Sequence, residues 1–220
     1  MTTVPVVYGS MISPYVRKVL ITLQMKHIAY DLQELIPFVA EHKQKILALN
    51  PLGKVPVYQE GDFLLADSSV ICAYLEKKHP ANPLYPAPAE SFARCLWYEE
   101  YADNHLIPTI ATVFFHTMLA TRFNVVPDRG AVKLALESQL PEIFNYLDHE
   151  IGAKKYLVAN QLSLADISMI SPFINFEFAG HAVDAKKWKN LSRYVADISL
   201  ESSVLYEFNR SKEKWAKRTT

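Results

Sequence analysis

The chain begins with a pattern of apolar and polar positions that predicts a strand, a helix and a second strand. Val4–Tyr8 is an apolar run of strand length, and residues 28–35 (IAYDLQEL) form a second one. Between them apolar residues recur at helical spacing, and we expect Arg17 and Lys18 on the polar face of that helix. Two strands joined in this way pair in parallel through a right-handed crossover. The apolar face of the expected helix comprises Val16, Val19, Leu20 and Leu23.

A hairpin and a third helix are predicted next. After a polar, helix-like stretch over 40–47, the segments VPVY (55–58) and FLLA (63–66) flank QEGD, which predicts an antiparallel hairpin with Gly61 at its turn. Asp67 or Ser68 then begins a helix with an apolar stripe. The order β-α-β-α-β-β-α within about 80 residues is typical of a mixed sheet with helices on its faces.

A proline-rich segment separates this region from a helical one. Four prolines fall in HPANPLYPAPAE, a composition that favours a stiff linker. We therefore expect a domain over 1–80, a linker over 81–90 and an all-helical domain over 91–220. The helical segments expected in this last domain lie near 92–119 with a kink at Pro108, 131–151 with a bend at Pro141, 163–178, 190–198 and 202–210. The polar tail after 210 is expected to fray, with Trp215 as a docking residue.

Composition narrows the classes of partner. The 220 residues are 50% hydrophobic and 21% charged, and 23 basic side chains balance 23 acidic ones. A formal net charge of zero gives no electrostatic case for a nucleic acid or an anionic membrane as the main partner. The N-terminal sequence does not resemble a signal peptide, and we expect no transmembrane span. Cys72 and Cys95 lie in helical patterns without a CxxC spacing, so buried free thiols are expected.

Three short motifs in the first 80 residues carry candidate chemistry. Ser13 precedes Pro14, the pair that favours an N-cap and a first helical position, and a helix start attracts anions. Lys54-Val55-Pro56 enters a strand, where either a cis bond or an ordinary trans edge proline fits the sequence. Asp67 and Ser68 begin a helix, where they serve as a simple cap or as a carboxylate-binding site. All three follow strands of one small sheet, at strand ends where open α/β sheets bind ligands.

The ordered motifs SPYVRKV, NPLGKVPV and LADSSVICAYLE, followed by a proline-rich linker and an all-helical half, resemble the cytosolic glutathione S-transferases. The resemblance covers nearly the whole chain and implies an α/β thioredoxin-like N-terminal domain followed by an all-α domain. The segment LSLADIS is a further match, in which Ser163 and Asp166 have the spacing of a capping box. We interpret this box as structural and not as part of a site. The overall type resembles bacterial, serine-dependent members of the family.

The resemblance implies glutathione as a co-substrate and no metal. Val55, before Pro56, would pair its backbone with the cysteinyl part of glutathione. Asp67 and Ser68 would hold the γ-glutamyl ammonium and carboxylate, while Lys54 and His42 would face the glycine carboxylate through charge-assisted hydrogen bonds. An exposed helix histidine without a role is the alternative for His42. The helical half would supply the pocket for a small apolar electrophile, for which we select Phe114, Phe115, His116 and Met118.

The expected chemistry is activation of the glutathione thiol. A free thiol has a pKa near 8.5, so roughly a few per cent is thiolate at pH 7, and the thiolate is the nucleophile. A hydroxyl donor and a helix N-terminus together could lower this pKa by about one to two units. Ser13 is the first candidate for the hydroxyl, Ser10 the second and Tyr8 the third.

The resemblance further implies a cytoplasmic homodimer, and a peroxidase reaction would use the same thiolate. Two alternatives stay open. One is a glutathione-dependent isomerase of the maleylacetoacetate type, although GSMISPY lacks the serine-cysteine run of that family. The other is a non-catalytic binding or assembly module with the same fold.

Overall fold

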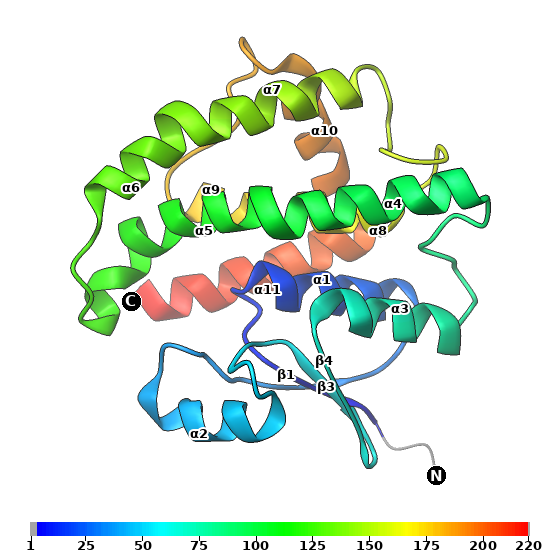
Figure 1. The fold of residues 1–220 in the computed structure, drawn as a ribbon, viewed down its shortest axis with the longest axis vertical. Coiled ribbons are helices and arrows are strands. Elements are labelled where there is room, and N and C mark those ends of the chain that lie inside the picture. The colour runs from blue at the N-terminus through cyan, green and yellow to red at the C-terminus, as the bar shows by residue number, and fades with distance from the viewer. Residues whose placement is uncertain (1–3, 220) are drawn as a thin grey trace. The chain divides into compact units, whose positions relative to one another are not determined.

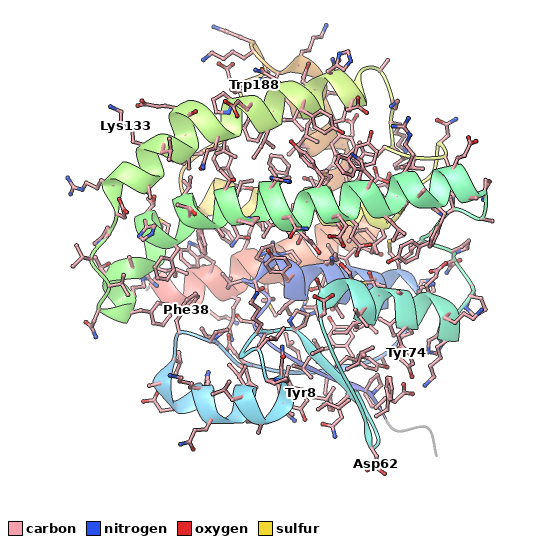
Figure 2. The ribbon with its side chains drawn as sticks, in the orientation of Figure 1. Tyr8, Phe38, Asp62, Tyr74, Lys133 and Trp188 are labelled. Carbon is pink, nitrogen blue, oxygen red and sulfur yellow. The ribbon has the colours of Figure 1, made fainter. Side chains whose placement is uncertain are left out.

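A four-stranded sheet of order β2-β1-β3-β4 organises the N-terminal part of the chain in the computed structural model, which describes residues 4–219. The central strand β1 pairs in parallel with β2 and antiparallel with β3, and β3 and β4 form the expected hairpin. Gly61 lies at the turn with φ of 59°, and Asp62 marks the hairpin tip in Figure 2. The strands are β1 (Val6–Tyr8), β2 (Asp31–Gln33), β3 (Val57–Glu60) and β4 (Phe63–Ala66).

Helices cover both faces of this sheet. The β-α-β-α-β-β-α order predicted from the sequence is confirmed, and α2 lies on the face opposite to α1 and α3 (Figure 1). Asp67, and not Ser68, is the N-cap of α3. The helices are α1 (Pro14–Met25), α2 (Ala40–Leu49) and α3 (Ser68–Lys78).

The polar face expected for α1 does not exist. Arg17 and Lys18 are both 0% exposed, so the prediction that places them on a solvated face is wrong. Arg17 donates hydrogen bonds to backbone carbonyls of the preceding loop, and Lys18 Nζ lies 3.0 Å from Ser69 Oγ on α3. A buried cation is tolerated where its donors are satisfied in this way.

The C-terminal helix α11 (Ser202–Thr219) belongs with the sheet. The sequence pattern assigns residues 205–220 to the helical domain, whereas the structure groups Leu205–Thr220 with Met1–Leu84 in one unit and Tyr85–Val204 in the other. The tail after residue 210, for which the sequence predicts fraying, is helical as far as Thr219. Trp215 is 9% exposed, in agreement with its expected docking.

The second unit is helical throughout its regular elements. Its first helices form one continuous path, α8 packs against α4, and α9 packs against α5. Asp166 completes the expected capping box with Ser163 at the start of α8. The α-helices are α4 (Ala89–Tyr101), α5 (Ile107–Phe114), α6 (Arg129–Leu134), α7 (Leu140–Ile151), α8 (Leu164–Ile170), α9 (Phe173–Phe178) and α10 (Lys189–Ser199).

Pro108 and Pro141, the two prolines at which the sequence predicts a kink or bend, each follow a π-helical turn. The π segment η1 (Ala102–Leu106) comes two residues before Pro108, and η4 (Ala135–Gln139) comes two residues before Pro141. Proline has no N–H to donate to the carbonyl four residues earlier, and a π turn is one way for a helix to absorb such a break. The helical path therefore continues through each proline. A further π turn, η2 (Phe115–Leu119), is followed by a tighter 3₁₀ turn, η3 (Ala120–Phe123).

The path from Ala89 to Phe123 is long and apolar enough to cross a membrane by length and composition alone. The core helix of a globular protein meets the same criterion, and this path packs against α8 and α9. Cys72 and Cys95 are free and buried as expected, and burial raises the pKa of the Cys95 thiol to about 12.

Candidate functional site

The loop between β1 and α1 is shaped by Gly9. This residue has φ of 152°, and a Cβ built on it would lie 2.5 Å from Val16 Cγ2, so a side chain does not fit. Its N–H donates to Gln33 O at 3.0 Å and continues the pairing of β1 with β2. The next residues, from Ser10 to Ser13, are thereby placed at the strand end and the start of α1.

Ser13 is the N-cap of α1, and Pro14 is the first helical residue, as the sequence predicts. The Ser13 Oγ accepts the Val16 N–H at 3.5 Å, at the outer limit of a hydrogen bond. Its side chain is half-buried, and among the described residues no acceptor takes its hydroxyl hydrogen. Ser13 therefore presents an O–H donor at the positive end of a helix.

The two other candidate hydroxyls have acceptors inside the protein. Ser10, only 6% exposed, donates to Glu34 Oε1 at 3.0 Å. Tyr8 is 8% exposed and donates to Gln59 Oε1 at 2.7 Å across the sheet. Figure 2 shows Tyr8 beside the sheet. Both hydroxyls would have to give up an internal bond before donating to a ligand.

The loop before β3 contains a cis peptide bond between Val55 and Pro56, one of the two possibilities left open by the sequence. Asn50 fixes this loop, because its Nδ2 donates to Lys54 O at 2.9 Å and its Oδ1 accepts the Leu52 N–H at 3.0 Å. Val55 precedes β3, which begins at Val57, so Val55 lies outside the pairing of β3 with β1 and β4. The Lys54 side chain is exposed.

The start of α3 combines an exposed carboxylate with a buried hydroxyl. Asp67 adopts φ of 78°, an unusual conformation for a residue with a side chain, and such conformations gather at functional sites. Its Oδ1 accepts the N–H groups of Ser69 and Val70 at 2.9 and 3.2 Å. Ser68 is 3% exposed, and the buried Lys18 donates to Ser69 Oγ. The helix dipole and Lys18 give this end of α3 a positive character.

His42 on α2 is half-buried and has a defined orientation. Its Nδ1 accepts the Ile36 N–H at 3.0 Å, which places the proton of the neutral ring on Nε2. A nitrogen that carries a proton and is not used by the protein fold is suited to donate to a carboxylate.

The residues selected for an electrophile pocket lie in the helical unit. Phe114 is 4% exposed, and its ring centroid lies 6.3 Å from that of Phe178, which makes it a core residue of that unit. Phe115, His116 and Met118 are half-buried in the π segment η2. His116 Nδ1 accepts the Asp128 N–H at 3.1 Å. Wider helical turns of this kind are frequent at functional sites.

Sequence reasoning missed three polar residues: Lys18 beside the start of α3, and Glu34 and Lys214 at the loop between β1 and α1. Lys18 could have been noticed, because it forms with Arg17 a cationic pair in the middle of an otherwise apolar helix segment. Glu34 and Lys214 are separated by 180 residues, and no local pattern links them.

These features define a class of protein with two units. The first is a thioredoxin-like unit whose strand ends and helix starts carry the candidate groups, and the second is a helical unit. A profile described as "Glutathione S-transferase, N-terminal domain" matches residues 7–83, and one described as "Glutathione S-transferase, C-terminal domain" matches residues 106–200. Glutathione S-transferase F13 of Arabidopsis thaliana is 31% identical over 203 residues, which cover 90% of this chain and 92% of that protein.

Solved structures agree on the fold. The crystal structure of glutathione transferase F7 from Populus trichocarpa has a TM-score of 0.81 at 24% identity and covers 93% of this chain and 97% of that one. A glutathione S-transferase from Rhodospirillum rubrum F11 has a TM-score of 0.81 at 24% identity, with 91% and 90% covered. The chain belongs to the glutathione S-transferase family, and its activity is that of a glutathione transferase.

Proposed function

We propose that this chain is a serine-dependent transferase in which Ser13 donates its hydroxyl hydrogen to the glutathione sulfur. The observation that carries the proposal is the difference between the three candidate hydroxyls. Ser10 and Tyr8 donate to Glu34 and Gln59, whereas Ser13 accepts from Val16 and keeps its own hydrogen for a ligand. That the chain is of the bacterial type stays a prediction.

The physical role of Ser13 is to favour the thiolate. A hydrogen bond to a charged sulfur and the N-terminus of α1 each stabilise the anion and leave the neutral thiol almost unaffected. Each unit by which the pKa falls requires about 1.4 kcal/mol, and these two interactions together supply one to two units. Ser13 itself forms no covalent bond. The thiol proton passes to water, and the sulfur lone pair forms a C–S bond to the electrophile. In an addition a π bond of the electrophile opens and its carbon takes up a proton, and in a substitution a group such as chloride leaves.

The remaining groups of the first unit are suited to the ends of glutathione. Val55, before cis-Pro56 and the start of β3, offers its backbone N–H and C=O to the cysteinyl segment. The γ-glutamyl end carries an ammonium and a carboxylate, which match the exposed Asp67 and the N-terminus of α3 at Ser68. Lys54 and His42 Nε2 are assigned to the glycine carboxylate.

The electrophile is assigned to the helical unit. Phe115, His116 and Met118 are half-buried and are the better pocket candidates, because Phe114 is committed to the core. The pocket would take a small apolar electrophile, and an organic hydroperoxide would react with the same thiolate. We further infer a cytoplasmic homodimer, with neither a nucleic acid nor a membrane as partner and no metal in the reaction.

Two alternatives make different predictions. A maleylacetoacetate-type isomerase would regenerate glutathione in each cycle, so glutathione would not be consumed. A binding module would bind glutathione and leave its thiol pKa near 8.5. The uncommitted Ser13 hydroxyl favours the transferase over the module, because binding alone needs no donor at the sulfur.

The test is conjugation of glutathione to a model electrophile, 1-chloro-2,4-dinitrobenzene, by the wild-type protein and by Ser13→Ala, Ser10→Ala and Tyr8→Phe. We expect Ser13→Ala alone to lose most of the conjugation rate. A Ser10→Ala variant that loses the rate while Ser13→Ala keeps it would overturn the assignment. Consumption of glutathione, measured in the same assay, separates the transferase from the isomerase.

A further inference from the structure

The C-terminal helix α11 holds the loop that carries Ser10 and Ser13. Lys214 Nζ lies 2.5 Å from Glu34 Oε2, and the other oxygen of Glu34 accepts the Ser10 hydroxyl. Glu34 directly follows β2, so a single carboxylate joins α11 to the first residue of the loop. Figure 1 shows α11 running beside α1, in agreement with these contacts.

A second attachment holds the middle of the same loop. Arg17 Nε donates to Ser211 Oγ at 3.2 Å, and the Ser211 hydroxyl donates to Met11 O at 3.3 Å. Arg17 Nη2 donates to Met11 O at 2.9 Å and to Ile12 O at 3.3 Å. Arg17 and Ser211 are both 0% exposed, so these bonds are shielded from water. The buried guanidinium of Arg17 thus links the carbonyls of the loop to Ser211 on α11.

A third contact fixes the register of the helix. Glu207, 0% exposed, accepts the Tyr30 hydroxyl at 3.0 Å and forms an ion pair with Arg210 at 2.9 Å. Burial and the charge of Glu207 raise the pKa of Tyr30, so the phenol stays a neutral donor. The contacts of Glu207 with Tyr30 and Arg210 therefore help to hold Ser211 and Lys214 in place beside the loop between β1 and α1.

We propose that α11 positions the thiol-activating loop, with Ser211 and Lys214 as positioning residues, and that Lys214 offsets the negative charge of Glu34 beside the thiolate. This inference rests on the proposed function, because it needs the thiolate to form at this loop. The family profile ends at residue 200, so the match assigns no role to α11. Other charges at the loop are Arg17, bonded as above, and Lys45, whose Nζ lies 5.4 Å from the Tyr8 ring centroid.

The sign of the effect distinguishes this role from a structural one. Without Lys214 the carboxylate of Glu34 loses a positive neighbour and repels a nearby thiolate more strongly, which raises the thiol pKa. Without Glu34 the ammonium of Lys214 attracts the thiolate, which lowers it. The side chains of the pair are 34% and 33% exposed, so water and salt screen the effect to about half a pH unit, a threefold change in the thiolate-to-thiol ratio.

The experiment is a pH titration of enzyme-bound glutathione, followed by thiolate absorbance in the ultraviolet, on five proteins. They are the wild type, Lys214→Met, Glu34→Gln, the double variant and Lys217→Met as a control. Lys217 is an exposed lysine of the same helix, so its removal takes away the same charge without touching the loop. Thermal unfolding of each variant reports stability separately.

We expect the thiol pKa to rise in Lys214→Met, to fall in Glu34→Gln, and to return close to the wild-type value in the double variant and the control. Restoring the charge with Lys214→Arg should restore the pKa. A Lys214→Met variant that melts earlier but keeps the wild-type thiol pKa would reduce α11 to a structural role and overturn the inference. A wild type that does not lower the thiol pKa at all would instead contradict the proposed function, and the inference with it.

Discussion

Ser13 and Ser163 are the N-caps of α1 and α8, and their hydroxyls have opposite surroundings. Ser163 is 0% exposed, and its hydroxyl donates to Asp166 Oδ2 at 2.9 Å within a complete capping box. Ser13 is half-buried, accepts one long bond from Val16 and keeps its hydrogen. A serine whose donor and acceptor are both satisfied stabilises a helix, while a serine with a spare donor at a helix start is suited to a ligand.

The surroundings of Asp166 extend this contrast. Its two oxygens accept four hydrogen bonds, from the N–H groups of Leu157 and Ser163 and from the hydroxyls of Ser163 and Tyr194, all between 2.8 and 2.9 Å. Burial raises the pKa of Asp166, and these four donors offset that rise in part. Both oxygens of Asp166 and the Ser163 hydroxyl hydrogen are used by the fold, so these groups are not available to bind a substrate.

The largest expected effect is a loss of stability when the capping box of Ser163 and Asp166 is broken. Asp166→Ala leaves several buried donors without an acceptor and should lower the free energy of unfolding by about 3 kcal/mol or more. Denaturant unfolding measures the change. The milder Tyr194→Phe, which removes one bond, should cost about 1 kcal/mol. If both variants unfold like the wild type, the box is not structural and the contrast with Ser13 fails.

The next largest expected effect is the loss of thiol activation when the Ser13 hydroxyl is removed. Ser13→Ala should lower the conjugation rate below pH 7 by about 10- to 30-fold, because the thiol pKa rises by the share of the hydroxyl, about one to one and a half units, while the N-terminus of α1 remains. Its free energy of unfolding should fall by less than about 1 kcal/mol, since the lost cap bond is long. Stopped-flow or steady-state rates and a denaturant titration give the two numbers. A large loss of stability with an unchanged conjugation rate would mean that Ser13, like Ser163, has only a structural capping role.

A smaller effect is expected on glutathione affinity at α3. Asp67→Ala removes the carboxylate that we assign to the γ-glutamyl ammonium and should raise the KM for glutathione about tenfold, with little change in the rate at saturation. The matched control Asp62→Ala removes an acid from the exposed hairpin tip and should leave KM unchanged. Equal KM values for the two variants would remove Asp67 from the site.

The smallest expected effect comes from Ser10. Ser10→Ala removes a hydroxyl that donates to Glu34, so it should change the conjugation rate by about threefold or less. A steady-state comparison with Ser13→Ala at one pH is sufficient. Should Ser10→Ala match the loss seen in Ser13→Ala, the two hydroxyls would share the activating role.

Local signals made part of this structure predictable. The capping box at Ser163, the turn at Gly61 and the cap at Asp67 depend on residues within a few positions of one another, and all three are confirmed. The parallel β1–β2 pair follows from the handedness rule for strand, helix, strand. The order of the motifs along the chain carried the family resemblance.

The parts that could not be predicted depend on contacts distant in sequence. Arg17 looks like a surface residue until Ser211, 194 positions away, closes its hydrogen bonds. The role of Lys214 also depends on a distant contact, because its partner Glu34 lies 180 positions earlier. The assignment of α11 to the first unit depends on such contacts as well. The choice between Ser10 and Ser13 likewise needed the position of Glu34, which no spacing in the first loop reveals.

The most direct test of the account is the thiol pKa of bound glutathione in the wild type and in Ser13→Ala, followed by ultraviolet absorbance across pH. The account predicts a wild-type value one to two units below that of free glutathione and a return toward the free value, near 8.5, in Ser13→Ala. Equal values in the two proteins would show that the Ser13 hydroxyl does not activate the thiol, and an unshifted wild-type value would favour a binding module.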